Sequence, residues 1–139
     1  MSRVIAIANQ KGGVGKSTTA INLSSCLGEM GQKVLTIDMD PQGNTTRGMG
    51  VDKDEQENTI YELLLSECEI EESIIKLEFD NVFLIPSNVN LAGAEIELIG
   101  IESKEFILKN QIEKIKEKYD YIVIDCPPSL NMLTINAMT

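Results

Sequence analysis

The chain has 139 residues, of which 42% are hydrophobic, and this is enough to bury the core of one domain. The formal net charge is −10, and counting along residues 51–139 gives nineteen acidic against seven basic residues. A surface this acidic repels nucleic acid at long range, so this part of the chain is by itself a poor candidate for a DNA-binding face and is expected to be a solvated acidic surface. The absence of histidine excludes Ser-His and Cys-His nucleophiles, and because neither an 18-residue apolar run nor a secretory leader is found, we expect a cytoplasmic protein.

The first elements predict a strand, a helix and a second strand. Val4–Ala8 is a short apolar run, typical of a strand buried on both faces of a parallel sheet. Ser17–Met30 has apolar residues near a 3.6-residue period, with Gly31 as the terminator, and Lys33–Asp38 follows as the next strand. Such a unit builds a parallel sheet that binds phosphate at the carboxyl ends of its strands.

The remaining segments predict an α/β fold. Thr59 and Glu62 have the spacing of a capping box before a short helix that reaches Leu65, and a second short turn is expected over Ile70–Leu77. Further strands are expected at Val82–Pro86 and Tyr121–Asp125, and further helices at Leu91–Ile99, Ser103–Lys118 and Leu130–Thr139. Because the last helix has no terminating glycine or proline, we expect residues 1–139 to form a single but incomplete domain.

A glycine-rich loop, Lys11–Thr18, joins the first strand to the first helix. Its glycines let backbone N–H groups approach phosphate oxygens, and the helix that follows directs its positive end to the same anion. Lys16 supplies an ammonium group for the β- and γ-phosphates, and Ser17 supplies a hydroxyl for Mg²⁺. The predicted nucleotide-binding residues are Lys11, Gly12, Gly13, Val14, Gly15, Lys16, Ser17 and Thr18.

The loop departs from the usual phosphate-binding pattern at two positions. Gln10 stands where the pattern begins with glycine, and a second lysine, Lys11, lies inside the loop. The alternative interpretation is a glycine-rich turn that only caps a helix. The strand before the loop and the helix after it favour the phosphate-binding interpretation.

Three aspartates follow predicted strands. Asp38 and Asp40 lie at the end of the second strand, and Asp125 ends the strand that begins at Tyr121. Because parallel strands end at one edge of the sheet, we expect these carboxylates to converge on the nucleotide, where they hold Mg²⁺ or orient the attacking water. Alternatively, strand-terminal aspartates are simply turn formers.

The three cysteines, Cys26, Cys68 and Cys126, are far apart and lack the C-x-x-C spacing of a metal site. We therefore expect them to be buried free thiols.

Four segments together resemble the ParA/Soj chromosome- and plasmid-partitioning ATPases, which have a deviant Walker A loop. They are Asn9–Thr18, Asp38–Asn44, Leu91–Glu95 and Asp125–Leu130. The resemblance implies a P-loop NTPase fold, a mostly parallel sheet flanked by helices. It also implies an ATPase that binds ATP or ADP with Mg²⁺, forms an ATP-dependent homodimer and hydrolyses ATP slowly.

The family resemblance implies a role for each matching residue. Lys11 matches the signature lysine that reaches the nucleotide of the other subunit, and Gly12 lies where the subunits approach closely. Asp40 matches the aspartate that positions the attacking water. The implied catalytic residues are thus Lys11, Lys16 and Asp40, and the implied Mg²⁺ contacts, direct or through water, are Ser17, Asp38, Asp40 and Asp125.

The implied partners are a ParB-like centromere-binding protein, which stimulates hydrolysis, and non-specific DNA, which family members bind through residues beyond position 139. The family is cytoplasmic and nucleoid-associated and needs no membrane. Two alternatives stay open. One is a fragment that neither hydrolyses ATP nor assembles, and the other is a MinD-like membrane-positioning ATPase, although MinD proteins lack the Pro41–Asn44 motif.

Overall fold

The computed structural model describes residues 3–7, 14–39, 43–52, 58–65, 68–77, 81–87 and 107–125. Five strands form one sheet in the order β1-β5-β2-β4-β3. The parallel strands are β1 (Arg3–Ile7), β5 (Tyr121–Asp125), β2 (Val34–Asp38) and β4 (Val82–Ile85), whereas β3 (Ile75–Lys76) pairs antiparallel with β4 at the edge. The predicted parallel α/β architecture is therefore confirmed.

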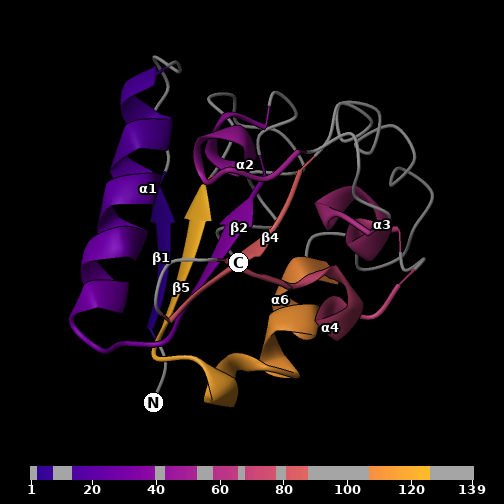
Figure 1. Ribbon diagram of the computed structural model, residues 1–139. Coiled ribbons are helices and arrows are strands. Elements are labelled where there is room, and N and C mark those ends of the chain that lie inside the picture. The colour runs from indigo at the N-terminus through magenta and orange to yellow at the C-terminus, as the bar shows by residue number, and fades with distance from the viewer. Residues whose placement is uncertain are drawn as a thin grey trace.

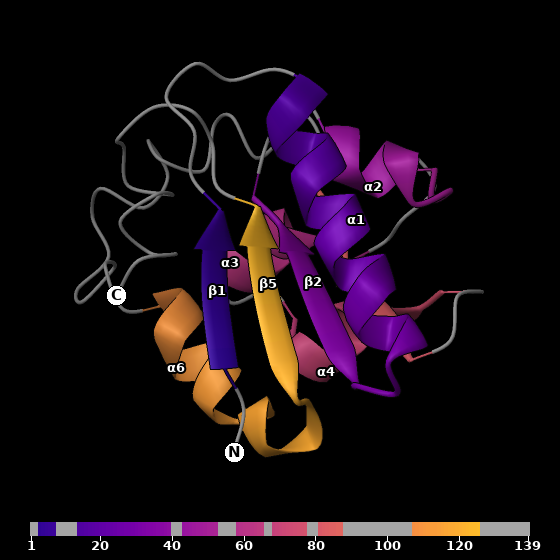
Figure 2. The ribbon, with the colours of Figure 1, turned by 90° about the vertical axis from the view of Figure 1, so that its left-hand side faces the viewer.

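Helices cover both faces of the sheet. Helix α1 (Val14–Glu29) lies on one face, with α2 (Asn44–Gly48) beside it (Figure 2). The other face is covered by α3 (Ile60–Leu64), α4 (Ile70–Ser73) and α6 (Ile107–Glu113), with the 3₁₀ turn η4 (Lys116–Lys118) leading into β5 (Figure 1). None of the helices in the described part of the chain is long and apolar enough to span a membrane.

Alternating side chains of the central strands divide the core into two layers. Leu35 and Ile37 of β2 pack in the larger cluster, together with residues of α3, α4 and α6. Val34 instead packs with Ala20 of α1, and Thr36 bonds with Ser24 of the same helix at 2.7 Å between hydroxyl oxygens. Successive strand residues point to opposite faces, so every second residue of β2 is directed to the α1 side.

Two predicted helix boundaries rest on local signals that the structure confirms. The Thr59 N–H donates to Glu62 Oε1 at 2.8 Å and the Thr59 hydroxyl oxygen accepts from Tyr61 N–H at 3.2 Å, so the capping box starts α3. Gly31 has φ 85°, and its N–H donates to Gly28 O at 3.0 Å after the end of α1. Glycine suits this left-handed position because it lacks a Cβ.

Other segments differ from the sequence-based expectations. The turn expected over Ile70–Leu77 is α4 followed by β3. Of the helix expected over Ser103–Lys118, residues 103–106 lie outside the described part of the chain, and the rest is α6 and then η4. The chain turns at Ile115, whose buried side chain packs in the larger core cluster. The expected helices at 91–99 and 130–139 lie outside the described residues.

The prediction of buried thiols is wrong for Cys26, which is exposed on α1. Its neighbours Ala20 and Ser24 occupy the buried side of that helix, so the 3.6-residue period directs position 26 to solvent. Cys68 is half-buried against the larger core cluster, and Cys126 lies outside the described residues.

Candidate functional site

Two buried carboxylates lie side by side at the carboxyl edge of the sheet. Asp38 is the last residue of β2, Asp125 is the last residue of β5, and the two are paired in register on these neighbouring strands. Both residues have 0% solvent exposure. Asp38 is two residues after Thr36, which contacts α1, so its side chain is directed to the α1 side as well. Asp38 accepts hydrogen bonds from α2, which lies beside α1, and this agrees with that direction.

Helix α2 binds both carboxylates through adjacent threonines. The Thr45 hydroxyl donates to Asp125 Oδ2 at 2.5 Å. The Thr46 N–H and the Thr46 hydroxyl both donate to Asp38 Oδ2, at 2.9 and 2.7 Å. Gly43, the residue before α2, provides no side-chain cap, so the Asp38 carboxylate satisfies an N–H of the first turn from a different element.

The strand β4 is joined to the same network at its carboxyl end. The N–H of Ser87, two residues after β4, donates to the Thr46 hydroxyl oxygen at 3.0 Å. Ser87, Thr45 and Thr46 are all fully buried. Three parallel strands, β5, β2 and β4, are therefore connected at this edge through one five-residue helix.

The start of α1 lies at this edge too. Figure 2 shows the first turn of α1 beyond the arrowheads of β1, β5 and β2. A helix N-terminus is partly positive because its first N–H groups have no partner within the helix, and the first turn of α1 contains no acidic residue to neutralise it. The edge thus combines an anion-attracting helix end with two buried carboxylates.

The structure brings together part of the predicted site. The backbone of Val14, Gly15, Lys16, Ser17 and Thr18 forms the beginning of α1, at the same edge as Asp38 and Asp125. Lys11, Gly12, Gly13 and Asp40 lie outside the described residues. Two site threonines, Thr45 and Thr46, were not predicted. A five-residue helix is too short for a periodic signal, and the one available clue was a pair of hydroxyl residues soon after Asp38 and Asp40.

The donor atoms at this edge suit a hard divalent cation. Within the described ranges no group of three or more acidic, cysteine or histidine residues forms a complete metal cage. Asp38 and Asp125 still offer oxygen ligands, which Mg²⁺ prefers, and Mg²⁺ usually binds through one or two carboxylates plus water and nucleotide phosphates. Two adjacent buried carboxylates also favour a cation over mutual repulsion. The residues present therefore fit Mg²⁺.

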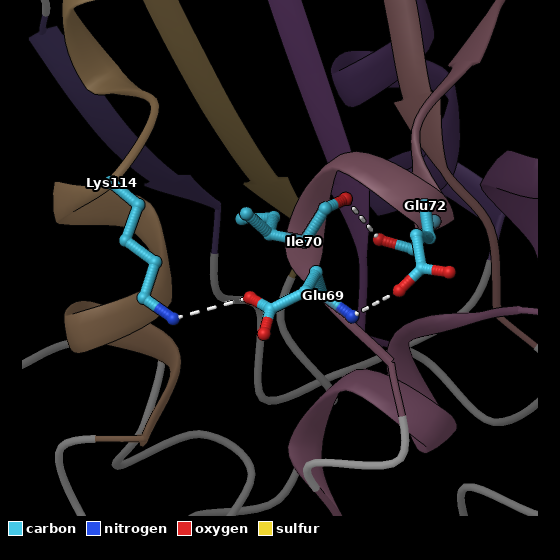
Figure 3. A network of polar contacts seen from close by, with 5 residues as sticks. Glu69, Ile70, Glu72 and Lys114 are labelled. Carbon is cyan, nitrogen blue, oxygen red and sulfur yellow. Dashed lines mark hydrogen bonds and ion pairs between the residues drawn. The ribbon is translucent and has the colours of Figure 1, made fainter.

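Another polar network, far from this edge, is exposed. Lys114 of the turn after α6 pairs with Glu69 at 3.3 Å, and the Glu69 N–H is capped by Glu72 Oε1 at 2.9 Å (Figure 3). The side chains of Lys114 and Glu69 are 53% and 71% exposed. Exposed pairs of this kind stabilise little and bind solvent, so they do not compete with the carboxyl edge as a functional site.

The sequence matches the model of the AAA_31 family, described as an AAA domain, over residues 2–139. The chain belongs to this family. The AAA_31 chain is 50% identical over 139 residues to the sporulation initiation inhibitor protein Soj of Bacillus subtilis (strain 168), covering 100% of this chain and 55% of Soj. It is 47% identical to the chromosome partitioning protein ParA of Caulobacter vibrioides (strain NA1000 / CB15N), covering 99% of this chain and 52% of that protein.

The fold of the AAA_31 chain is similar to that of a crystal structure of cobyrinic acid a,c-diamide synthase from Mycobacterium smegmatis with bound ATP analogue and magnesium. The TM-score is 0.94 and the identity 40%, over 99% of this chain and 56% of that one. The P-loop fold and the ParA/Soj resemblance are therefore confirmed. The chain spans about half the length of the curated relatives it matches.

Proposed function

We propose that residues 1–139 form one nucleotide-binding domain of a ParA/Soj-type ATPase, which binds Mg²⁺-ATP at the carboxyl edge of the sheet and hydrolyses it to ADP and phosphate. The observation that carries the proposal is the register pairing of Asp38 and Asp125, both buried at the edge where α1 begins. A phosphate chain satisfies the helix end, and a cation satisfies the carboxylates.

In this proposal, each residue contributes a simple physical action. The loop from Lys11 to Thr18 binds the phosphates through its backbone N–H groups, while Lys16 binds the β- and γ-oxygens. Mg²⁺, when bound, neutralises the charge that develops on the phosphates. Ser17, Asp38 and Asp125 hold it, directly or through water, and Asp40 orients the attacking water.

The proposed active unit is an ATP-dependent homodimer. A lysine inserted from the partner subunit can stabilise transition-state charge as an arginine finger does, and this couples hydrolysis to dimerisation. Lys11 is the residue that the family resemblance assigns to this role, and Gly12 provides the close approach. A side chain at Gly12 is therefore expected to hinder dimerisation.

For the whole protein we propose chromosome or plasmid partitioning, with a ParB-like protein and nucleoid DNA as partners. Soj and ParA, the curated relatives at 50% and 47% identity, have names that support partitioning. The name of the diamide synthase structure points instead to amide synthesis, but that protein is less similar, at 40% identity. The Asp38–Asn44 segment adds support, since it resembles the second motif of the partitioning proteins. The acidic balance of residues 51–139 agrees with DNA contacts made elsewhere.

Release of inorganic phosphate from Mg²⁺-ATP tests the catalytic proposal. We expect slow turnover by the 139-residue chain and none by Lys16→Ala, because the variant lacks the ammonium that contacts the transferred phosphate. Equal rates for the two proteins would defeat the enzymatic proposal for this chain. The chain would then be a non-catalytic fragment, and nucleotide binding would have to be tested separately.

A further inference from the structure

We propose that Thr46 is a positioning residue for the nucleotide site: its hydroxyl fixes the Asp38 carboxylate for Mg²⁺ and ties it to the end of β4. The inference rests on the proposed function, because it assigns Asp38 to the Mg²⁺-nucleotide. Thr46 has 0% solvent exposure and lies in α2, outside the phosphate loop. Thr46 therefore acts on the bound nucleotide only indirectly, through its hydrogen bonds to Asp38.

The hydrogen bonds of Thr46 determine the direction of its hydroxyl proton. The Thr46 oxygen accepts from the Ser87 N–H at 3.0 Å and lies 2.7 Å from Asp38 Oδ2. A backbone N–H can only donate and an ionised carboxylate can only accept, so the hydroxyl proton is directed to Asp38. The threonine thus has one donor and one acceptor role, both of them used.

The Asp38 carboxylate is oriented by two hydrogen bonds that reach the same oxygen atom. The Thr46 N–H, at 2.9 Å, reaches the same Oδ2 atom as the hydroxyl. Two donors from one residue, one on the backbone and one on the side chain, fix this oxygen relative to α2. Outer hydrogen bonds of this kind orient metal-binding carboxylates and raise metal affinity.

Helix α2 packs closely against α1. Gly48, the last residue of α2, lies so close to Ile21 of α1 that a Cβ built on it would overlap the Cδ1 atom of Ile21. Thr46 is therefore held between α1, which begins at the phosphate loop, and β4. We infer that removing its hydroxyl loosens Asp38 without altering the phosphate-binding loop.

Isothermal titration of the 139-residue chain with ADP tests this inference, once with Mg²⁺ and once with EDTA. We expect wild type to bind ADP more tightly with Mg²⁺. Thr46→Val keeps the side-chain shape but has no hydroxyl, and we expect about a tenfold loss of affinity with Mg²⁺ and no change in EDTA. Thr46→Ser restores the hydroxyl and should restore the affinity.

Thr36→Val is the matched control. Thr36 is equally buried and lies on the same strand as Asp38, but its hydroxyl bonds to Ser24 rather than to a carboxylate. We expect Mg²⁺ to raise the ADP affinity of this variant as much as it raises that of wild type. If Thr46→Val does not fold, as judged by circular dichroism, Thr46→Cys replaces it, because a thiol keeps the volume and bonds weakly, and the same loss with Mg²⁺ is expected.

The outcomes separate the two proposals. Wild-type affinity of Thr46→Val in the presence of Mg²⁺ would overturn the positioning role and leave the proposed function intact. An equal loss with Mg²⁺ and with EDTA, or a loss as large in Thr36→Val, would also overturn it, since each indicates a general structural effect. If wild type binds no ADP under either condition, the proposed function fails and the positioning role fails with it.

Discussion

The carboxyl and amino edges of the sheet differ in whether their charged side chains are buried or exposed to solvent. At the carboxyl edge, Asp38 and Asp125 are completely buried and are bound by the hydroxyls of α2. At the amino edge, Asp120 is exposed just before β5, and its carboxylate accepts the N–H of the exposed Lys33 at 2.7 Å. Burial of a carboxylate is costly unless it is bonded or paired, whereas an exposed one costs little.

The amino edge is built for packing rather than for binding. The Lys33 ammonium lies 5.3 Å from the ring centroids of both Phe83 and Tyr119, and the two rings meet edge to face at 5.5 Å. Lys118 pairs with Glu71 nearby, and both side chains are more than half exposed. Such contacts each stabilise weakly and leave the charges in water. Buried charge, not charge as such, therefore distinguishes the candidate site.

The largest expected effect comes from removing the loop lysine. We expect Lys16→Ala to weaken Mg²⁺-ATP binding by about a hundredfold, because the variant loses the ammonium that contacts the phosphates. Lys33→Ala at the amino edge is the matched control and should bind as wild type does. Isothermal titration measures both affinities, and an equal loss in the two variants would remove the functional distinction between the edges.

Asp38→Asn should separate function from stability. The amide oxygen can still accept from Thr46, but one of the two adjacent negative charges is gone. Without Mg²⁺ we expect the free energy of unfolding to rise by about 1 kcal/mol, while Mg²⁺-dependent ADP affinity falls about tenfold. Urea unfolding in EDTA and ADP titration measure the two effects. Destabilisation together with unchanged Mg²⁺ dependence would mean that Asp38 is purely structural.

Tyr119, at the amino edge, makes the free energy of unfolding depend on pH in the alkaline range. Burial raises the pKa of the Tyr119 hydroxyl above its ordinary 10.0, and the negative charge of Glu71 raises it further. The unfolded chain therefore releases the Tyr119 proton at lower pH than the folded chain does. The protonated Tyr119 hydroxyl thus makes its full contribution to the free energy of unfolding below pH 10.0, and this contribution is lost as pH rises through the higher pKa of the folded state.

The Tyr119→Phe variant removes this titration. Urea unfolding across the alkaline range should show wild type losing stability more steeply with pH than the variant. Glu71→Gln should retain most of the steepness, because burial is the larger cause of the raised pKa. Parallel curves for wild type and Tyr119→Phe would contradict this account of the amino edge.

The smallest effect is expected at the exposed ion pair between Lys114 and Glu69. Because both side chains are mostly in water, Lys114→Ala should change the free energy of unfolding by no more than about 0.5 kcal/mol. Raising the salt concentration should reduce even that difference. Urea unfolding at low and high salt measures it, and a loss of several kcal/mol would show that the exposed network matters more than its exposure indicates.

The sequence predicts those elements whose patterns are long or carry a specific local signal. Three parallel strands, β5, β2 and β4, are apolar runs that are mostly buried, and α3 begins at a capping box that two residues define. The expectation that the first strand is buried on both faces is wrong: β1 stands at the end of the strand order in the described sheet, and Val4 is 49% exposed. Short elements carry too few residues for a period. β3 is formed by two residues that pair with Leu84 and Phe83, and this pairing is a tertiary contact that no local pattern contains.

Some residues of the candidate site could likewise be predicted from the sequence, whereas others could not. The strand-terminal positions of Asp38 and Asp125 follow from the strand pattern, so their convergence at one edge could be predicted. The contribution of Thr45 and Thr46 could not, because it depends on where a five-residue helix packs in three dimensions. The exposure of Cys26 has a related cause, since its residue type favours burial whereas its position on α1 directs it to solvent.

In the proposed function, nucleotide binds at the carboxyl edge of the sheet and not at the amino edge. The most direct test is a titration of the ¹⁵N-labelled chain with Mg²⁺-ADP, followed by amide chemical shifts. We expect the largest shifts at the start of α1 and at Asp38, Thr46 and Asp125, with Lys33 and Asp120 unchanged. An absence of shifts, or shifts confined to Lys33 and Asp120, would contradict it.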